Sequence, residues 1–234
     1  MKIPNYQPIH FEQWVIIDQR IQKEGLGIEY VPEKHQLEIS KNHQLLAKLY
    51  LPWDHDWIKN ELQKIEDFHL ALLAIRAGQA FAGYFHQDQL EDHKVFRAYM
   101  VRQKQGKSQI KHLKTKGKSR AGSRIRLAET ARFFNEINER LQDYSEKFPI
   151  SRWGISCSKT LWPYFFNAEV SPPFSPKQEN VLSLPFHYHQ ASFEELQSSY
   201  SALLNFHLFL SAEGKDFFQE ISTTNSEPED DENW

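Results

Sequence analysis

The amino-acid sequence predicts an α/β fold in which helices flank a mixed β-sheet. The first observation is a block at residues 68–102, where three apolar segments separated by turns indicate neighbouring strands. The second is a long helix with one apolar stripe that follows a basic segment. The third is composition: 40% hydrophobic and 14% aromatic residues in a chain of 234 are enough to form a substantial core.

The N-terminal residues 1–67 predict an α+β extension packed on this core. Their periodicity indicates a helix, three strands and a second helix, at 9–23, 27–31, 35–39, 45–52 and 56–67. A single cysteine, Cys157, excludes an internal disulfide framework and fits a reducing compartment. Neither a signal peptide nor a long apolar segment is recognisable, so a cytoplasmic protein without a membrane partner is expected.

Residues 68–212 are expected to form the main domain. Strands are predicted at 69–76, 80–85, 94–102 and 153–158, a short helix or turn at 161–167, and long helices at 123–148 and 193–210. Ser123 is the predicted N-cap of the first long helix, because its hydroxyl can accept from a free amide of the first turn. Its apolar stripe consists of Leu127, Phe134, Ile137, Leu141, Tyr144 and Phe148. Residues 222–234 are acidic and predict a disordered tail.

The largest charge asymmetry lies between the third of these strands and the helix at 123–148. Residues 102–126 contain ten Lys/Arg and no Asp/Glu, which leaves 28 − 10 = 18 basic against 31 acidic residues elsewhere. A basic segment in an acidic chain indicates a polyanionic partner, because each cation that meets a phosphate releases counterions. Charge alone does not distinguish DNA from RNA. The candidate phosphate-binding residues are Arg102, Lys104, Lys107, Lys111, Lys114, Lys116, Lys118, Arg120, Arg124 and Arg126.

One glutamine in this basic segment is a candidate catalytic residue. Gln109 follows Gly106 and Ser108 in a loop expected at 103–122, which has no carboxylate, cysteine or paired histidines for acid/base or metal chemistry. A neutral amide could orient a water molecule while backbone amides stabilise an oxyanion. Lone glutamines in loops are common, so the spacing by itself leaves a solvated loop as the alternative.

The segments HKVFRAYMVRQKQGKSQ, KSRAGSRIRLAET and FNEI together resemble the Vms-like release factor domain, a peptidyl-tRNA hydrolase module of ribosome-associated quality control with bacterial relatives. That domain is similar to the central domain of eukaryotic and archaeal class I release factors. The matching residues are Phe96, Arg97, Tyr99, Val101 and Arg102 in the strand, Lys104, Gln105, Gly106, Ser108 and Gln109 in the loop, Ser119, Ala121, Gly122, Ser123, Arg124 and Arg126 at the helix start, and Asn135 and Glu136 within the helix. Lys107 stands where the family has a second glycine.

The resemblance implies an RNase-H-like core of the kind found in release-factor central domains. It also implies a monomer that enters the peptidyl-transferase centre of a stalled large ribosomal subunit and frees the nascent chain from peptidyl-tRNA. Gln109 would act at the tRNA 3′ end, with Gly106 and Ser108 as further catalytic residues of the same loop, and the basic residues would grip RNA. Either water attack on the ester or cleavage of the tRNA near its CCA end fits, and no cofactor is implied.

Two alternatives from other functional classes stay open. In the first, the basic loop only docks on RNA or a ribosome and has no catalytic role. In the second, His86, Asp88, Glu91, Asp92 and His93 serve a metal-dependent nuclease, although a solvated turn is the simpler interpretation of these residues. His187 and His189 have a metal-ligand spacing on a predicted strand without a third ligand nearby, and Cys157, Trp153 and Trp162 are expected to contribute to the core.

Overall fold

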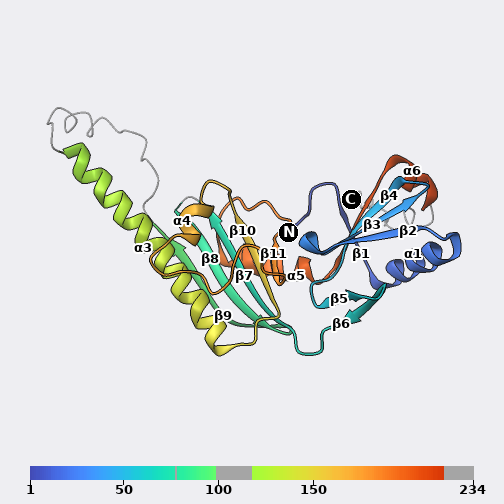
Figure 1. The fold of residues 1–234 in the computed structure, drawn as a ribbon, viewed down its shortest axis with the longest axis horizontal. Coiled ribbons are helices and arrows are strands. Elements are labelled where there is room, and N and C mark those ends of the chain that lie inside the picture. Colours follow the sequence, from blue (N-terminus) through green and yellow to red (C-terminus); the bar gives the residue numbers. More distant parts are fainter. Residues whose placement is uncertain (77, 99–117, 219–234) are drawn as a thin grey trace, which may run out of the picture. The chain divides into compact units, whose positions relative to one another are not determined.

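The computed structural model describes residues 1–76, 78–98 and 118–218, with the side chains of 118–127 left out (Figure 1). The chain divides into two compact units. We call residues 66–200 the central unit, and residues 2–65 together with those from 201 onward the terminal unit. The sequence placed residues 201–212 in the main domain. The structure differs there because a strand at 206–210 pairs with strands of the N-terminal residues. The acidic tail at 222–234 lies outside the described residues.

The central unit contains a five-stranded mixed sheet with the order β11-β10-β7-β8-β9. Its strands are β7 (His69–Arg76), β8 (Gln79–His86), β9 (Gln89–Arg97), β10 (Arg152–Cys157) and β11 (Val181–Ser183). β7, β8 and β9 pair antiparallel, whereas β10 pairs parallel with both β7 and β11. The strand predicted at 94–102 therefore begins earlier, at Gln89, and is described only to Arg97. This architecture confirms the predicted mixed sheet with flanking helices.

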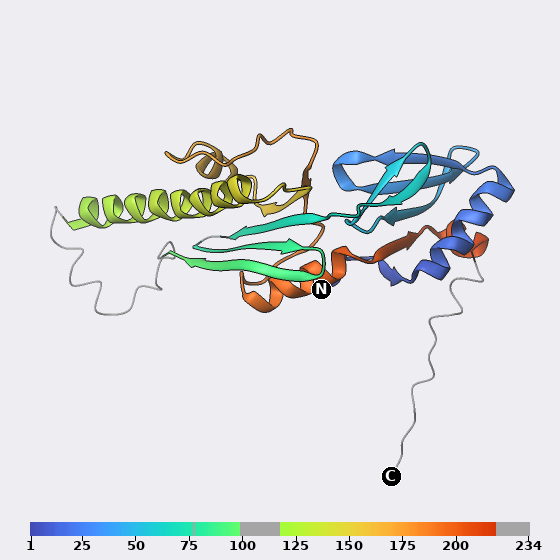
Figure 2. The ribbon, with the colours of Figure 1, turned by 90° about the horizontal axis from the view of Figure 1, so that it is seen from below.

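Helices cover both faces of this sheet, as Figure 2 shows. The helices are α3 (Lys118–Lys147), α4 (Trp162–Phe166) and α5 (Phe193–Leu203). Residues of β7 that alternate along the strand pack on α3, while the other face meets α5, where Leu196 lies against Gly83 of β8. Burial on both faces explains why β7 is an uninterrupted apolar run rather than an alternating one.

The helix α3 begins five residues earlier than its predicted N-cap, so Ser123 lies inside the helix. Phe134, Ile137, Leu141 and Tyr144 of the predicted stripe are buried in the core of the central unit. Leu127 belongs to the part of α3 whose side chains are not described. Phe148, just after the helix, is half-buried and stacks on Tyr84 with ring centroids 3.9 Å apart.

The terminal unit is built on an antiparallel sheet with the order β1-β12-β4-β3-β2. Its elements are β1 (Gln7–Ile9), α1 (Phe11–Glu24), β2 (Gly27–Val31), the short 3-10 helix η1 (Pro32–Lys34), β3 (Gln36–Lys41), β4 (Gln44–Tyr50), β5 (His55–Ile58), β6 (Glu61–Lys64), β12 (Phe206–Leu210) and α6 (Ala212–Phe217). Trp14, Ile17 and Ile21 of α1 are buried in its core, which confirms the predicted amphipathic helix. Among the described residues, no helix is both long and apolar enough to span a bilayer.

One predicted helix is wrong, and another is predicted too long. The segment 56–67 forms the β5–β6 hairpin instead, because Lys59 and Asn60 adopt left-handed conformations (φ 52° and 64°) that make a tight turn. The helix predicted at 193–210 ends at Leu203. Residues 206–210 form β12, whose backbone pairs with β4 on one side and β1 on the other.

Candidate functional site

The predicted catalytic loop connects β9 to α3 in the central unit. Its candidate residues that lie outside the described part of the chain are Arg102, Lys104, Gly106, Lys107, Ser108, Gln109, Lys111, Lys114 and Lys116. Four further cations, Lys118, Arg120, Arg124 and Arg126, lie on the first turns of α3. The structure thus locates the two elements from which the loop departs and to which it returns.

An acidic residue of β9 bonds to two side chains of α3. Asp92 accepts a hydrogen bond from Arg140 Nη1 at 3.2 Å and another from the Tyr144 hydroxyl at 3.0 Å. Burial and the Asp92 carboxylate raise the pKa of Tyr144, so its hydroxyl remains a donor. The helix and strand that carry the loop are therefore joined by one carboxylate in addition to their shared core.

Asn135 and Glu136, the helix residues that match the family, have structural roles here. Asn135 Oδ1 accepts from the Val170 amide at 3.2 Å, and Glu136 pairs with Arg132 at 2.7 Å. The buried Asn138 donates to the carbonyls of Phe165 (3.0 Å) and Val170 (2.7 Å). These bonds attach the segment after β10 to the middle of α3.

The first half of α3 extends beyond the ends of the strands (Figures 1 and 2). Within the part of α3 with described side chains, residues 128–132 are exposed or half-buried, and the buried stripe starts at Phe133. At about 1.5 Å per residue, the turns from 118 to 132 form a stalk roughly 20 Å long. The C-terminal end of the basic segment is thus carried away from the core on a helical stalk.

The carboxylates and histidines proposed for a metal nuclease do not gather into one site. Asp92 bonds to α3, whereas the His93 ring lies against Phe193 of α5, with centroids 4.6 Å apart. Alternation along β9 explains the separation, since consecutive side chains point to opposite faces. The metal-nuclease alternative based on residues 86–93 is therefore wrong in its choice of ligands.

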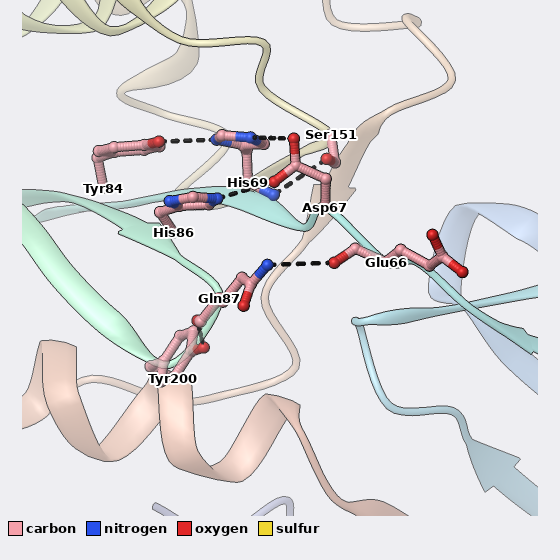
Figure 3. A network of polar contacts seen from close by, with 8 residues as sticks. All are labelled: Glu66, Asp67, His69, Tyr84, His86, Gln87, Ser151 and Tyr200. Carbon is pink, nitrogen blue, oxygen red and sulfur yellow. Dashed lines mark hydrogen bonds and ion pairs between the residues drawn. The ribbon is translucent and has the colours of Figure 1, made fainter.

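His86 instead belongs to a cluster that sequence reasoning missed (Figure 3). Asp67, His69 and His86 each offer one ligand atom, and these atoms lie within 4.8 Å of one another. His69 and His86 are direct cross-strand partners in the β7–β8 hairpin. The signal was present in the predicted hairpin, because antiparallel pairing of residues 69–76 with residues 79–86 places these histidines opposite each other.

The remaining candidates have structural surroundings. Trp153 is buried in the core of the central unit, and Trp162 packs against the same core, as expected. Cys157 also packs there, and burial raises the pKa of its thiol to about 12. His187 and His189 are exposed and follow β11 rather than lying in a strand, so their predicted strand is wrong.

Comparison with known proteins gives one family match. No curated protein matches the chain. A solved structure titled "Vms1 mitochondrial localization core" is distantly similar, with a TM-score of 0.42, 12% identity, and coverage of 87% of this chain and 91% of that one. The family model described as Bacteroidetes VLRF1 release factor matches residues 70–210, more than half of the chain. This range contains β8, β9, all but the first residue of β7, the basic segment and α3, and it confirms the resemblance to Vms-like release factors. The chain belongs to the Bacteroidetes VLRF1 release factor family.

Proposed function

We propose that this protein frees nascent chains from peptidyl-tRNA on stalled large ribosomal subunits, and that Gln109 is its catalytic residue. The observation that carries the proposal is the family match over residues 70–210, which includes the Gln109 loop and both elements that anchor it. In this proposal the central unit is the RNase-H-like catalytic domain. The protein works as a cytoplasmic monomer without a membrane partner.

The charge at the start of α3 supports an RNA phosphate partner. The first turn contains Lys118 and Arg120 and no acidic residue. A helix N-terminus carries about half a positive charge, so cations there are unfavourable for the helix itself by a few tenths of a kcal/mol each. A phosphate bound at this end makes the cations favourable instead, because the free amides and the cations then both interact with an anion. The unfavourable placement is explained if the helix meets RNA.

The chemistry of the loop supports release without a metal or a carboxylate base. Residues 102–126 contain no Asp or Glu, so proton abstraction by a carboxylate within the segment is excluded. The Gln109 amide can both donate and accept hydrogen bonds, which allows it to orient an attacking hydroxyl. Backbone amides beside Gly106 and Ser108 supply donors for the oxyanion. Hydrolysis of the peptidyl ester and cleavage near the tRNA 3′ end both meet these requirements.

Gln109→Ala tests the catalytic assignment, with Gln105→Ala as the matched control in the same loop. Purified stalled large subunits carrying labelled peptidyl-tRNA report release, and co-sedimentation over a salt series reports binding. We expect Gln109→Ala to lower the release rate about 10²- to 10³-fold, the usual effect of losing one transition-state contact, and to leave binding unchanged. Unchanged release in Gln109→Ala, with binding intact, would instead identify a docking loop.

The 3′ end of the tRNA after reaction identifies the bond. An intact CCA end with a free ribose hydroxyl means that the ester was hydrolysed. A shortened tRNA means that a phosphodiester was cut. Repeating the release assay in EDTA, under conditions that keep the subunit intact, tests metal dependence directly, and full activity there is expected for a glutamine-based mechanism.

A further inference from the structure

The histidine end of the central sheet, formed by Asp67, His69 and His86, is built like a cation site (Figure 3). The two imidazole rings stack in parallel, with centroids 4.3 Å apart and planes 9° apart. Both therefore present their Nε2 atoms to the same carboxylate. His86 Nε2 lies 2.8 Å from Asp67 Oδ1, and His69 Nε2 lies 3.2 Å from Asp67 Oδ2. The two nitrogens and the carboxylate thus lie within 4.8 Å of one another.

The His69 ring is held so that its Nε2 is available. His69 is only 7% exposed, and its Nδ1 lies 2.7 Å from the Tyr84 hydroxyl. Its Nε2 is buried and makes no hydrogen bond with any described residue, although it faces Asp67. Because the Tyr84 hydroxyl can donate or accept, it can stabilise the tautomer whose Nε2 is unprotonated. A fixed Nδ1–H and a free Nε2 are typical of histidines that bind metals.

The backbone around the cluster is also fixed. The Ser151 hydroxyl accepts from the His69 amide at 3.0 Å, and the Ser151 amide donates to the His69 carbonyl at 2.9 Å. Gln87 donates through its side chain to the Glu66 carbonyl and through its amide to the Phe68 carbonyl. These bonds hold the backbone on both sides of Asp67, so binding a ligand would cost little backbone conformational entropy.

We propose that Asp67, His69 and His86 bind a divalent transition-metal ion of the zinc class. Imidazole nitrogen and carboxylate oxygen suit this ion, which takes such ligands at about 2.0–2.2 Å. Ligand atoms of a tetrahedral ion lie roughly 3.3–3.6 Å apart. The contacts of Asp67 with His86 (2.8 Å) and His69 (3.2 Å) would therefore lengthen slightly, while the largest separation in the cluster, at most 4.8 Å, would shorten. Asp67 and His86 supply that movement, because their side chains are 69% and 40% exposed.

The site differs from the release loop in place and in role. His69 starts β7, whereas the loop end of the sheet lies at Arg76 and at Arg97 of β9. Seven strand residues at about 3.3 Å each separate the two ends by roughly 23 Å. The ion would join β7, β8 and the segment that leads into the central unit, with water completing its shell on the exposed side. It would be a structural ion that stabilises the central unit and takes no part in release.

Titration of the full chain with Zn²⁺ and Co²⁺ tests this proposal. Isothermal titration with Zn²⁺, after removal of metals by a chelator, should give one ion per chain. Co²⁺ should give visible absorption bands of a tetrahedral complex. At a Zn²⁺ concentration about 100-fold above the dissociation constant, the thermal midpoint should rise by roughly 5–10 °C.

Matched variants locate the site. Asp67→Asn and His86→Ala should each weaken Zn²⁺ binding at least tenfold, and both residues are exposed enough for the fold to persist. Tyr84→Phe keeps the buried ring and loses only the hydroxyl, so a loss of about tenfold would identify its hydrogen bond to His69 as part of the site. Glu66→Gln removes a neighbouring carboxylate that points away from the cluster and should have no effect.

The double variant His187→Ala/His189→Ala tests the other histidine pair. It should bind Zn²⁺ as tightly as the unmodified chain. Absence of stoichiometric Zn²⁺ binding would overturn the proposal, and so would binding that survives both Asp67→Asn and His86→Ala or that is lost in the double variant. None of these outcomes depends on release activity.

Discussion

The two ends of the central sheet differ in the charge of the ligand that their residues suit. At the loop end, residues 102–126 provide ten cations and no carboxylate. At the histidine end, ligand atoms of Asp67 and two imidazoles lie within 4.8 Å of one another. The first combination suits a polyanion and the second suits a divalent cation. The length of the strands separates the two ends of the sheet by about 23 Å. A small α/β unit can thus carry the proposed release chemistry and the proposed cation site at separate ends of one sheet.

The largest expected effect is on the free energy of unfolding, when a core aromatic residue near each end of the sheet is replaced by alanine. Phe134 of α3, 1% exposed, lies in the core of the central unit just after the stalk, whereas the half-buried Phe148 stacks on Tyr84 close to the histidines. Phe134→Ala should lower the free energy of unfolding by about 3–5 kcal/mol, because it leaves a cavity in a close-packed core. Phe148→Ala should cost about half as much or less, since part of its ring is already in water.

Urea unfolding monitored by circular dichroism measures both losses. Tyr164→Ala is the control, because Tyr164 stacks on Phe134 but is 56% exposed, and it should cost less than about 1 kcal/mol. Equal losses for Phe134→Ala and Phe148→Ala would mean that the two ends are supported alike.

The next effect concerns the carboxylate that joins β9 to α3. Asp92→Ala should cost about 1–2 kcal/mol, because the buried Tyr144 hydroxyl loses its acceptor and Arg140 loses its partner. Asp92→Asn should cost less than about 1 kcal/mol, since the amide oxygen still accepts from Tyr144 and the ion pair is partly exposed. Asp88→Ala, in the exposed β8–β9 turn, should change stability by less than about 0.5 kcal/mol. An Asp92→Ala variant as stable as Asp88→Ala would show that the core alone positions α3.

At the loop end, replacing Lys107 by glycine should have a smaller effect, on the release rate. If the family's second glycine position needs a left-handed conformation, lysine there is strained by about 1 kcal/mol, which corresponds to roughly fivefold in rate. Lys107→Gly should therefore raise the release rate severalfold, while the slope of log binding constant against log salt falls by about one. Lys111→Gly removes the same charge without that strain and should change only the salt slope. Identical kinetics for the two variants would exclude a strained position.

The elements that the sequence predicted well are those whose own pattern decides their structure. β7 is apolar over its length because both faces are covered, and α3 carries a regular buried stripe. The hairpin at 55–64 was missed because DWIKNELQK is composed largely of helix-compatible residues, and the left-handed Lys59–Asn60 turn outweighs that preference. β12 was missed because its pairing partners, β1 and β4, lie far away in the sequence.

The two candidate sites differ in the same way: one lies within a single sequence segment, and the other depends on pairing between distant residues. The loop candidates are contiguous, so charge and residue order were enough to propose them. The Asp67–His69–His86 cluster requires the register of β7 and β8 together with the conformation of the residues before β7. Spacing along the chain does not report that proximity. The sequence neighbours Asp92 and His93 do not join His86 in one site, because alternation along β9 places them on opposite faces.

The smallest expected effect is a pH dependence at the histidine end. The hydrogen bond from His86 and the contact with His69 lower the pKa of Asp67 below its ordinary value. A carboxylate with a depressed pKa in the folded state stabilises the fold above its unfolded pKa of about 4, and this contribution is lost as pH falls through the folded value. The stability difference between the unmodified chain and Asp67→Asn, measured by urea unfolding in EDTA, should therefore be largest above about pH 5 and shrink toward pH 3. Glu66→Gln should give no such trend, because its carboxylate points away from the histidines. A difference that stays constant from pH 3 to pH 6 would mean that Asp67 acts here only as a neutral hydrogen-bond acceptor, and the contrast in charge between the two ends of the sheet would then rest on the bound cation alone.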